Sequence, residues 1–155
     1  MHTIKGSNVR VIFSEGAVKI YRLGHWLHSR HFFRLGQFFT VLNRLLYATV
    51  LPSSATIGTN FTLGYGGLGV VIHSLSTIGN NVHICQNVTI GRNPNSEGVP
   101  SIGNNVYIGP GAVVSGKIHI GDNSVIGANS VVLHNVSPGE FVAGVPAKCV
   151  KPVNK

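Results

Sequence analysis

The sequence has few of the residues that would place it in several large classes of protein. It has only two cysteines, Cys85 and Cys149, and their spacing fits neither a disulfide framework nor a zinc motif. No apolar run reaches the eighteen or so residues that a membrane-spanning helix needs. The first sixteen residues contain no apolar core followed by a small-residue cleavage site, so no secretory signal is expected. A reduced, cytoplasmic setting is the simplest prediction.

Acidic residues are also scarce. Four Asp and Glu stand against twelve Lys and Arg, which gives a net charge of +8. The excess lies in residues 1–47, where seven basic residues accompany the single acid Glu15. The rest of the chain is nearly neutral and has no basic stripe interleaved with aromatic residues, so we expect no nucleic acid partner. Peripheral contact of the basic N-terminal arm with an anionic membrane surface stays open as an alternative to packing.

A six-residue period dominates the remainder of the chain. Twelve aliphatic residues occupy the same place in the cycle: Ile57, Leu63, Ile72, Ile78, Ile84, Ile90, Ile102, Ile108, Val114, Ile120, Ile126 and Val132. Such a period is typical of a β-helix in which each hexapeptide forms one flat face. Three hexapeptides complete a triangular turn, so the pattern predicts a mainly β solenoid of about four turns.

Two breaks interrupt the period, between Leu63 and Ile72 and between Ile90 and Ile102. Breaks in a solenoid repeat map to loops, often on the binding face. The pattern therefore divides the chain into an N-terminal helical arm (1–50), a β-helix (51–137) and a C-terminal strap (138–155).

The arm is expected to form two short helices within residues 15–47, the first capped by Ser14. The second has apolar residues on one broad face, from Leu35 to Leu46. We expect the helices to pack on the end of the solenoid, or on another subunit, and so to cover an exposed strand edge.

Three blocks of sequence resemble the serine acetyltransferase family, whose fold is a left-handed parallel β-helix. They are YRLGHWL at 21–27, the coils at 84–92 and 101–133, and AGVPAK at 143–148. The resemblance implies an acyltransferase that moves an acetyl group from acetyl-CoA to a hydroxyl. It also implies clefts between the subunits of a homotrimer, and no metal.

The resemblance fails at one place that matters for chemistry. The family's Asp-His pair falls on Gly64 and Tyr65, within LGYGGLGVV at 63–71. A second family acid falls near Thr49, and a family histidine of the long loop falls on Val99.

His73 is the best remaining base, because an imidazole with a pKa near neutrality can accept a hydroxyl proton. It follows the irregular segment and is expected at the same corner as the missing pair; alternatively, it fills a turn position. A phenol, whose ordinary pKa is near 10, is a poor base, so Tyr65 is expected to orient substrate or to pack at a bulge. Gln86 and Gly66 are expected to line the acceptor cleft, whereas His83 is expected at another corner in a structural or exposed role.

Binding of CoA is expected along the coils, where small residues permit close approach of the pantetheine arm. The residues that the resemblance implies are Gly91, Arg92, Gly111, Ala112, Ala128 and Lys148. Lys148 could pair with a phosphate of CoA, and the loop at 93–100 is expected to be mobile and to cover the acceptor cleft.

The main functional prediction is an acetyl-CoA-dependent O-acetyltransferase for a small acceptor, or for a sugar of surface-polysaccharide biosynthesis. Serine O-acetylation for cysteine biosynthesis is the nearest alternative. A non-catalytic scaffold is a further alternative, since the Asp-His pair is missing. A zinc lyase on the same solenoid is disfavoured because the chain has no two histidines separated by four residues.

Overall fold

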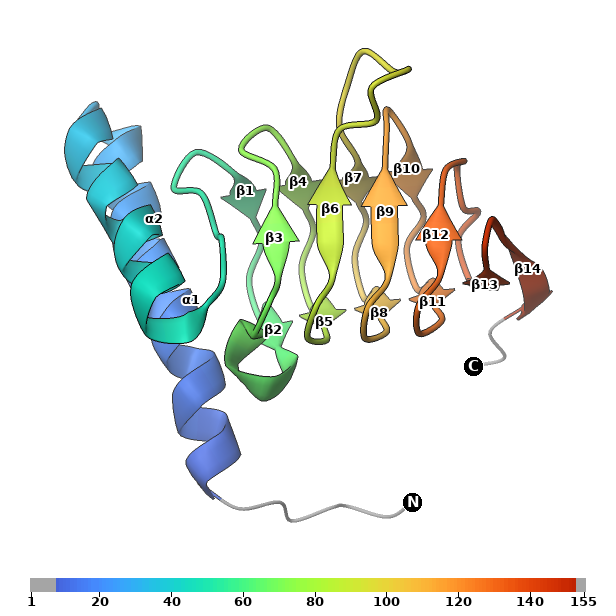
Figure 1. The fold of residues 1–155 in the computed structure, drawn as a ribbon, viewed down its shortest axis with the longest axis horizontal. Coiled ribbons are helices and arrows are strands. Elements are labelled where there is room, and N and C mark those ends of the chain that lie inside the picture. The colour runs from blue at the N-terminus through green and yellow to red at the C-terminus, as the bar shows by residue number, and fades with distance from the viewer. Residues whose placement is uncertain (1–7, 153–155) are drawn as a thin grey trace.

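The computed structural model describes residues 8–152, which form two helices, a solenoid of short strands and a C-terminal hairpin (Figure 1). Residues 1–7 of the expected arm and residues 153–155 of the strap lie outside this part. The expected absence of a secretory signal rests partly on the first of these ranges. The solenoid strands are β1 (Thr56–Ile57), β2 (Thr62–Leu63), β3 (Val71–Ile72), β4 (Thr77–Ile78), β5 (His83–Ile84), β6 (Thr89–Gly91), β7 (Ser101–Ile102), β8 (Tyr107–Ile108), β9 (Val113–Ser115), β10 (His119–Ile120), β11 (Val125–Ile126) and β12 (Val131–Val132).

These strands form three parallel faces, as the six-residue period predicts. The first face is β1-β4-β7-β10, the second contains β2, β5, β8 and β11, and the third is β3-β6-β9-β12. The register pairs each repeat aliphatic with the next one on the same face, for example Leu63 with Ile84 and Ile84 with Ile108. Each of these aliphatic side chains points inward, and none is more than 5% exposed. The expected four turns are confirmed.

Asparagines build the turns between the first and second faces. Asn60, Asn81, Asn105 and Asn123 all adopt positive φ. Their side-chain amides form a ladder in which each donates to the next at 3.0–3.2 Å. Asparagine tolerates the left-handed conformation better than most residues, so its recurrence fixes the shape of this corner.

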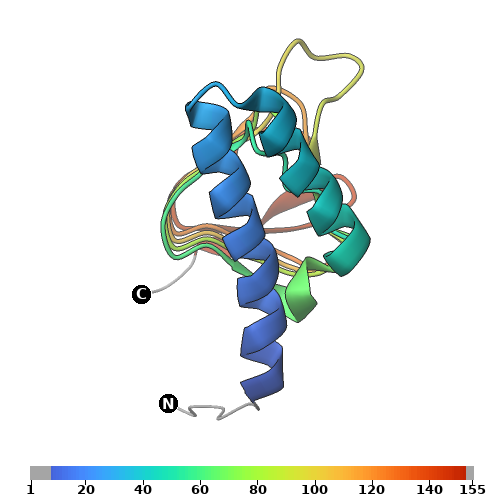
Figure 2. The same ribbon diagram turned by 90° about the vertical axis from the view of Figure 1, so that its left-hand side faces the viewer.

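The helices α1 (Asn8–Ser29) and α2 (Phe33–Tyr47) lie side by side over one end of the solenoid (Figure 2). The expected division of the arm into two helices is confirmed, since α1 ends at Ser29 and α2 begins at Phe33. The expected cap at Ser14 is wrong, because α1 begins at Asn8 and Ser14 lies inside it. On the inner side of α1, the Nδ1 of His25 contacts the carbonyl oxygen of Ser53 at 2.8 Å, and Arg22 donates to the carbonyl oxygens of Ile57 and Gly58. These bonds satisfy the open edge of the first coil.

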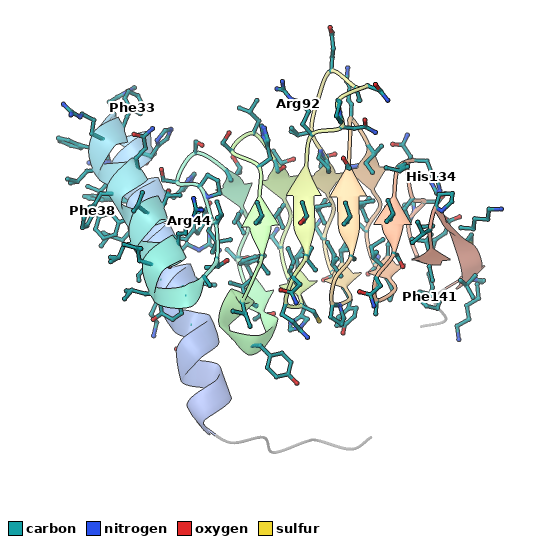
Figure 3. All side chains as sticks on the ribbon, in the orientation of Figure 1. Phe33, Phe38, Arg44, Arg92, His134 and Phe141 are labelled. Atoms are coloured by element: carbon teal, nitrogen blue, oxygen red, sulfur yellow. The ribbon has the colours of Figure 1, made fainter. Side chains whose placement is uncertain are left out.

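Small residues let both helices lie close to each other and to the solenoid. A β-carbon on Gly24 would stand 2.9 Å from the β-carbon of Phe39, and one on Gly36 would stand 3.1 Å from the carbonyl oxygen of Gly24. The buried residues of α2 are Gly36 and Asn43 rather than its leucines. The apolar face of α2 therefore points away from the solenoid, and Phe33 and Phe38 project outward in Figure 3.

The C-terminal strap is a hairpin of β13 (Glu140–Gly144) and β14 (Ala147–Pro152), which extends the second face. The strands pair antiparallel, so the strap departs from the repeat as expected. Within residues 8–152, no helix is both long and apolar enough to cross a membrane.

Candidate functional site

Two corners of the solenoid carry the residues singled out by sequence. The second corner is the set of turns that follow β2, β5, β8 and β11, and the third corner is the set that follows β3, β6, β9 and β12. The first break in the repeat lies at the second corner, where the short helix η1 (Gly64–Gly67) leaves the coil. The second break lies at the third corner, where residues 92–100 project from the body (Figure 1).

Tyr65 lies on η1 in a conformation unusual for its type. Its backbone has φ 50° and ψ 37°, which is left-handed, and its side chain is 68% exposed. Within residues 56–152 the other non-glycine residues with positive φ are all asparagines: Asn60, Asn81, Asn87, Asn105, Asn123 and Asn129. The left-handed conformation costs a tyrosine more free energy than an asparagine, and such backbone strain is common at functional sites.

The second corner also holds the two expected acceptor-binding residues. Because Leu63 pairs with Ile84, Gln86 stands one coil from Tyr65, where hexapeptide counting expects it. Gly66 also has positive φ but is buried, so it can offer little beyond backbone groups. Thr49, at the position of the family's second acid, is fully buried and donates to the carbonyl oxygen of Val70.

His73 lies at the third corner, not at the corner of Tyr65. It follows Ile72 at the end of β3, whereas η1 precedes the start of that strand. The expectation that one corner carries both residues is therefore wrong within a single chain. The extra residues of the first break form η1 before β3, and the strand then crosses a whole face before His73.

The ring of His73 is held by its own turn. Its Nδ1 accepts the backbone N–H of Leu75 at 3.2 Å. In the neutral ring this bond places the proton on Nε2, so the outward nitrogen is a donor. For His73 to act as a base through Nε2, the ring must first give up this hydrogen bond.

The projecting loop at 93–100 begins after Arg92, which is exposed at its base (Figure 3). The loop is tied to the next coil, because the hydroxyl of Ser96 accepts the backbone N–H of Lys117 at 2.9 Å. The backbone N–H of Ser96 in turn donates to the carbonyl oxygen of Asn93 at 3.0 Å. Val99, at the position of the family's loop histidine, is only half-buried.

The residues expected to bind CoA are spread over three places. Gly91 and Arg92 lie at the third corner, Gly111 and Ala128 at the second, and exposed Lys148 on β14. A β-carbon on Gly91 would have nothing closer than 4.0 Å, so this surface is open to a ligand. Ala112 is fully buried and both of its backbone groups are hydrogen-bonded, so it can only shape the corner.

Sequence reasoning missed a cluster on the outer face of the second sheet, beside Tyr65. Thr62, His83 and Tyr107 lie on three successive coils in direct register. The Nδ1 of His83 contacts the hydroxyl oxygen of Thr62 at 2.9 Å, and its ring stacks on Tyr107 with centroids 5.4 Å apart and planes 9° apart. The sequence does contain a signal for this cluster. Each of the three residues directly precedes an aliphatic residue of the repeat, and this position assigns all three to one face.

Burial shapes the titration of this cluster. Removal of the ring from water lowers the pKa of His83 below its usual value, which favours the neutral imidazole. The thiol of Cys85 lies 3.2 Å from the hydroxyl of Tyr107, and this hydrogen bond, with partial burial, raises the pKa of Tyr107. A hollow of about 150 Å³ opens beside Thr62, between α1 and the first coil.

The comparisons with known proteins agree with this architecture. Residues 100–134 match the family "Bacterial transferase hexapeptide (six repeats)". The chain is 38% identical to a serine acetyltransferase of Bacillus subtilis over 86% of its length and 62% of the relative's. It is 37% identical to one of Helicobacter pylori over 86% of its length and 79% of the relative's.

Solved structures place the fold in the same group. The serine acetyltransferase of Vibrio cholerae superposes with a TM-score of 0.87 at 32% identity, over 92% of this chain and 56% of that one. The enzyme of Brucella abortus in complex with coenzyme A superposes with a TM-score of 0.85 at 31% identity, over 89% and 56%. The chain thus spans little more than half the length of these structures.

These findings correct the main functional prediction. The named relatives and structures are serine acetyltransferases, so the expectation of an enzyme for surface polysaccharides is wrong, and the serine alternative is better supported. The left-handed parallel β-helix and the acyltransferase class are confirmed. With its twelve solenoid strands, its helical end cap and its C-terminal strap, the chain belongs to the serine acetyltransferase family of hexapeptide-repeat acyltransferases.

Proposed function

We propose that this protein transfers the acetyl group of acetyl-CoA to the hydroxyl of serine. The observation that carries the proposal is the identity of 37–39% to serine acetyltransferases over most of the chain. The match covers 86% of the chain and therefore extends beyond the coils of residues 51–137, which the fold alone would not require.

The reaction asks three things of the chain. A base must take the proton of the acceptor hydroxyl while its oxygen attacks the thioester carbonyl. N–H donors must stabilise the negative charge on the carbonyl oxygen. The carbon–sulfur bond then breaks, and the departing thiolate takes up the proton that the base removed.

The surface beside Gly91 suits the pantetheine arm, because nothing near this residue would hinder a close approach. Arg92 and Lys148 are exposed cations that can pair with the phosphates of CoA. Tyr65 and Gln86, adjacent at the second corner, would orient the acceptor. The assignment of the base to His73 stays a prediction and requires the opposite ring tautomer.

The direct test is turnover of acetyl-CoA by the purified protein with L-serine, followed by release of the CoA thiol and by the mass of the product. We expect O-acetylserine, with much lower rates for sugar hydroxyls. Binding of CoA without turnover for any hydroxyl acceptor would overturn the proposal and favour the scaffold alternative.

The homotrimer is also part of the proposal. The second and third corners lie on different edges of the solenoid, so a site that uses both needs a neighbouring chain to bring them together. Sedimentation equilibrium tests this, and a monomer with full activity would contradict it.

Peripheral membrane contact is proposed for the outer face of the helices. There Trp26, Phe33 and Phe38 are exposed beside Arg30 and Arg34, a combination suited to an anionic bilayer surface. Flotation with vesicles that contain phosphatidylserine tests the contact. A different result would assign the face to chain–chain packing instead. In that case the unaltered protein would not bind vesicles, and Phe38→Ser would lose a higher oligomer that the unaltered protein forms.

A further inference from the structure

We propose that His83, which sequence reasoning placed in a structural role, is the general base of this enzyme. The inference rests on the proposed acetyl transfer and names the residue that takes the proton of the acceptor hydroxyl. It is carried by the position of the His83 ring between Thr62, Tyr107 and Gly64, at the edge of the second corner.

The first argument is that a glycine stands beside Nε2. This nitrogen lies 3.6 Å from the point where a β-carbon on Gly64 would stand, and the same β-carbon would lie 3.2 Å from the α-carbon of Cys85. A larger side chain at position 64 would crowd both atoms. Glycine instead leaves this side of the half-buried ring without a side chain from the coil before it.

The second argument is the direction of the hydrogen bond on the other nitrogen. The Nδ1–H of His83 can donate to the hydroxyl oxygen of Thr62 at 2.9 Å, which leaves the lone pair on Nε2. A threonine oxygen accepts as readily as it donates, so this tautomer costs nothing. His73 differs, because a backbone N–H can only donate and so fixes the proton on its outward nitrogen.

The third argument is the way in which the ring is held. Tyr107 stacks against one side with nearly parallel planes, and burial keeps the imidazole neutral near pH 7. The titratable groups that face it are the phenol of Tyr107, on β8, and the thiol of Cys85, at the end of β5. The raised pKa of Tyr107 keeps the phenol uncharged near pH 7, so the phenol does not favour the imidazolium form.

The fourth argument is location. Gly64 is the immediate neighbour of Tyr65, and Cys85 is the immediate neighbour of Gln86. The lone pair of His83 thus faces the corner that carries both residues expected to orient the acceptor. There the hydroxyl proton moves to Nε2 as the acceptor oxygen attacks the thioester carbonyl, and the same nitrogen returns it to the CoA thiolate after the carbon–sulfur bond breaks.

The test compares three single substitutions in the full chain: His83→Ala, His73→Ala and His119→Ala. His119 is the matched control, because its Nδ1 contacts the hydroxyl of Ser101 at 2.9 Å in the same cross-coil arrangement, but on the first face. We expect His83→Ala to lower kcat for serine acetylation by about 100-fold or more, the usual contribution of a general base. The control His119→Ala should keep kcat within about threefold of the unaltered protein, and His73→Ala tests the competing assignment of the base.

Three further readouts separate catalysis from folding. His83→Ala should bind CoA with unchanged affinity, added imidazole should restore part of its rate, and the acidic limb of the kcat profile should disappear. In the unaltered enzyme that limb should lie below the ordinary histidine pKa of about 6.5, since a base works only when deprotonated and burial lowers this pKa.

The outcomes are distinct. If the unaltered protein does not acetylate serine, the proposed function fails. If the unaltered protein acetylates serine and His83→Ala retains the full rate, the assignment to His83 is overturned. The assignment is also overturned if His83→Ala loses both the rate and CoA binding and imidazole does not restore the rate. A loss confined to His73→Ala would return the role to His73.

Discussion

The hydroxyl of Tyr21 donates a hydrogen bond of 2.7 Å to the carbonyl oxygen of Ala55, and so ties helix α1 to the first coil of the solenoid. Burial raises the pKa of Tyr21 to about 12, so the phenol remains a donor at any physiological pH. The same coil end also accepts bonds from Arg22 and His25, which makes α1 the cap of the otherwise open strand edge.

Removal of this one hydroxyl should destabilise the protein measurably. We expect Tyr21→Phe to lower the free energy of unfolding by about 1–2 kcal/mol, because the buried carbonyl of Ala55 loses its side-chain donor. Urea unfolding followed by circular dichroism measures the change. Tyr47→Phe is the control, since among residues 15–152 its hydroxyl has no hydrogen-bond partner, and an equal loss in both variants would contradict the assigned role.

A substitution of Tyr65 should stabilise the protein, in contrast to Tyr21→Phe. Asparagine accepts the left-handed backbone more readily, so Tyr65→Asn should raise the free energy of unfolding by roughly 0.5–1 kcal/mol. If Tyr65 orients the acceptor, the same change should raise the KM for serine. Steady-state kinetics and chemical unfolding on one preparation test both parts.

Asn129→Gly is the control for Tyr65→Asn, because it alters a positive-φ turn residue three coils beyond η1 and should affect neither property by much. A Tyr65→Asn variant that is both less stable and fully active would show that the tyrosine serves packing alone.

The repeat was legible from sequence because one aliphatic residue per hexapeptide points inward and little else can fill that position. Ile57 to Val132 therefore located every strand of the solenoid. The helices were harder to place. Ser14 is a good cap residue in isolation, but nothing in its neighbourhood stops a helix that already begins at Asn8.

The site was less legible for a geometric reason. Counting along the chain shows which residues share a face, but it does not show which nitrogen of a ring is already bonded. The sequence predicts that His73 can act as a base, but it does not show that the backbone N–H of Leu75 already donates to the Nδ1 of this ring. His83 looked structural because its neighbours Thr62 and Tyr107 come from other coils, 21 and 24 residues away in the chain.

The open surface at Gly91 allows a test of CoA placement that does not disturb the fold. A β-carbon there would meet no atom closer than 4.0 Å, so we expect Gly91→Leu to leave thermal stability almost unchanged. If the pantetheine arm crosses this point, the variant should bind CoA at least about tenfold more weakly by calorimetry, since a branched side chain would occupy its path.

Gly79→Ala provides the contrast to Gly91→Leu, because a β-carbon there would stand 2.6 Å from the carbonyl oxygen of Gly103 on the next coil. We expect this smaller change to lower the melting temperature while the remaining folded protein binds CoA normally. Normal CoA binding by Gly91→Leu would move the cofactor path away from the third corner.

The strap should be held more firmly in acid than in alkali. Both nitrogens of His134 face carbonyl oxygens, Nδ1 that of Asn135 at 3.1 Å and Nε2 that of Ala147 at 2.6 Å, and these bonds raise the pKa of His134. The protonated ring can donate to both oxygens, whereas the neutral ring can donate to only one. The extra stability is thus complete below the unfolded pKa of about 6.5 and is lost as pH rises through the higher folded pKa.

We therefore expect His134→Ala to lower the melting temperature more at about pH 5.5 than at about pH 8.5. Scanning fluorimetry of both proteins at the two pH values measures this, and an equal decrease at both would show that the second hydrogen bond contributes nothing to the strap.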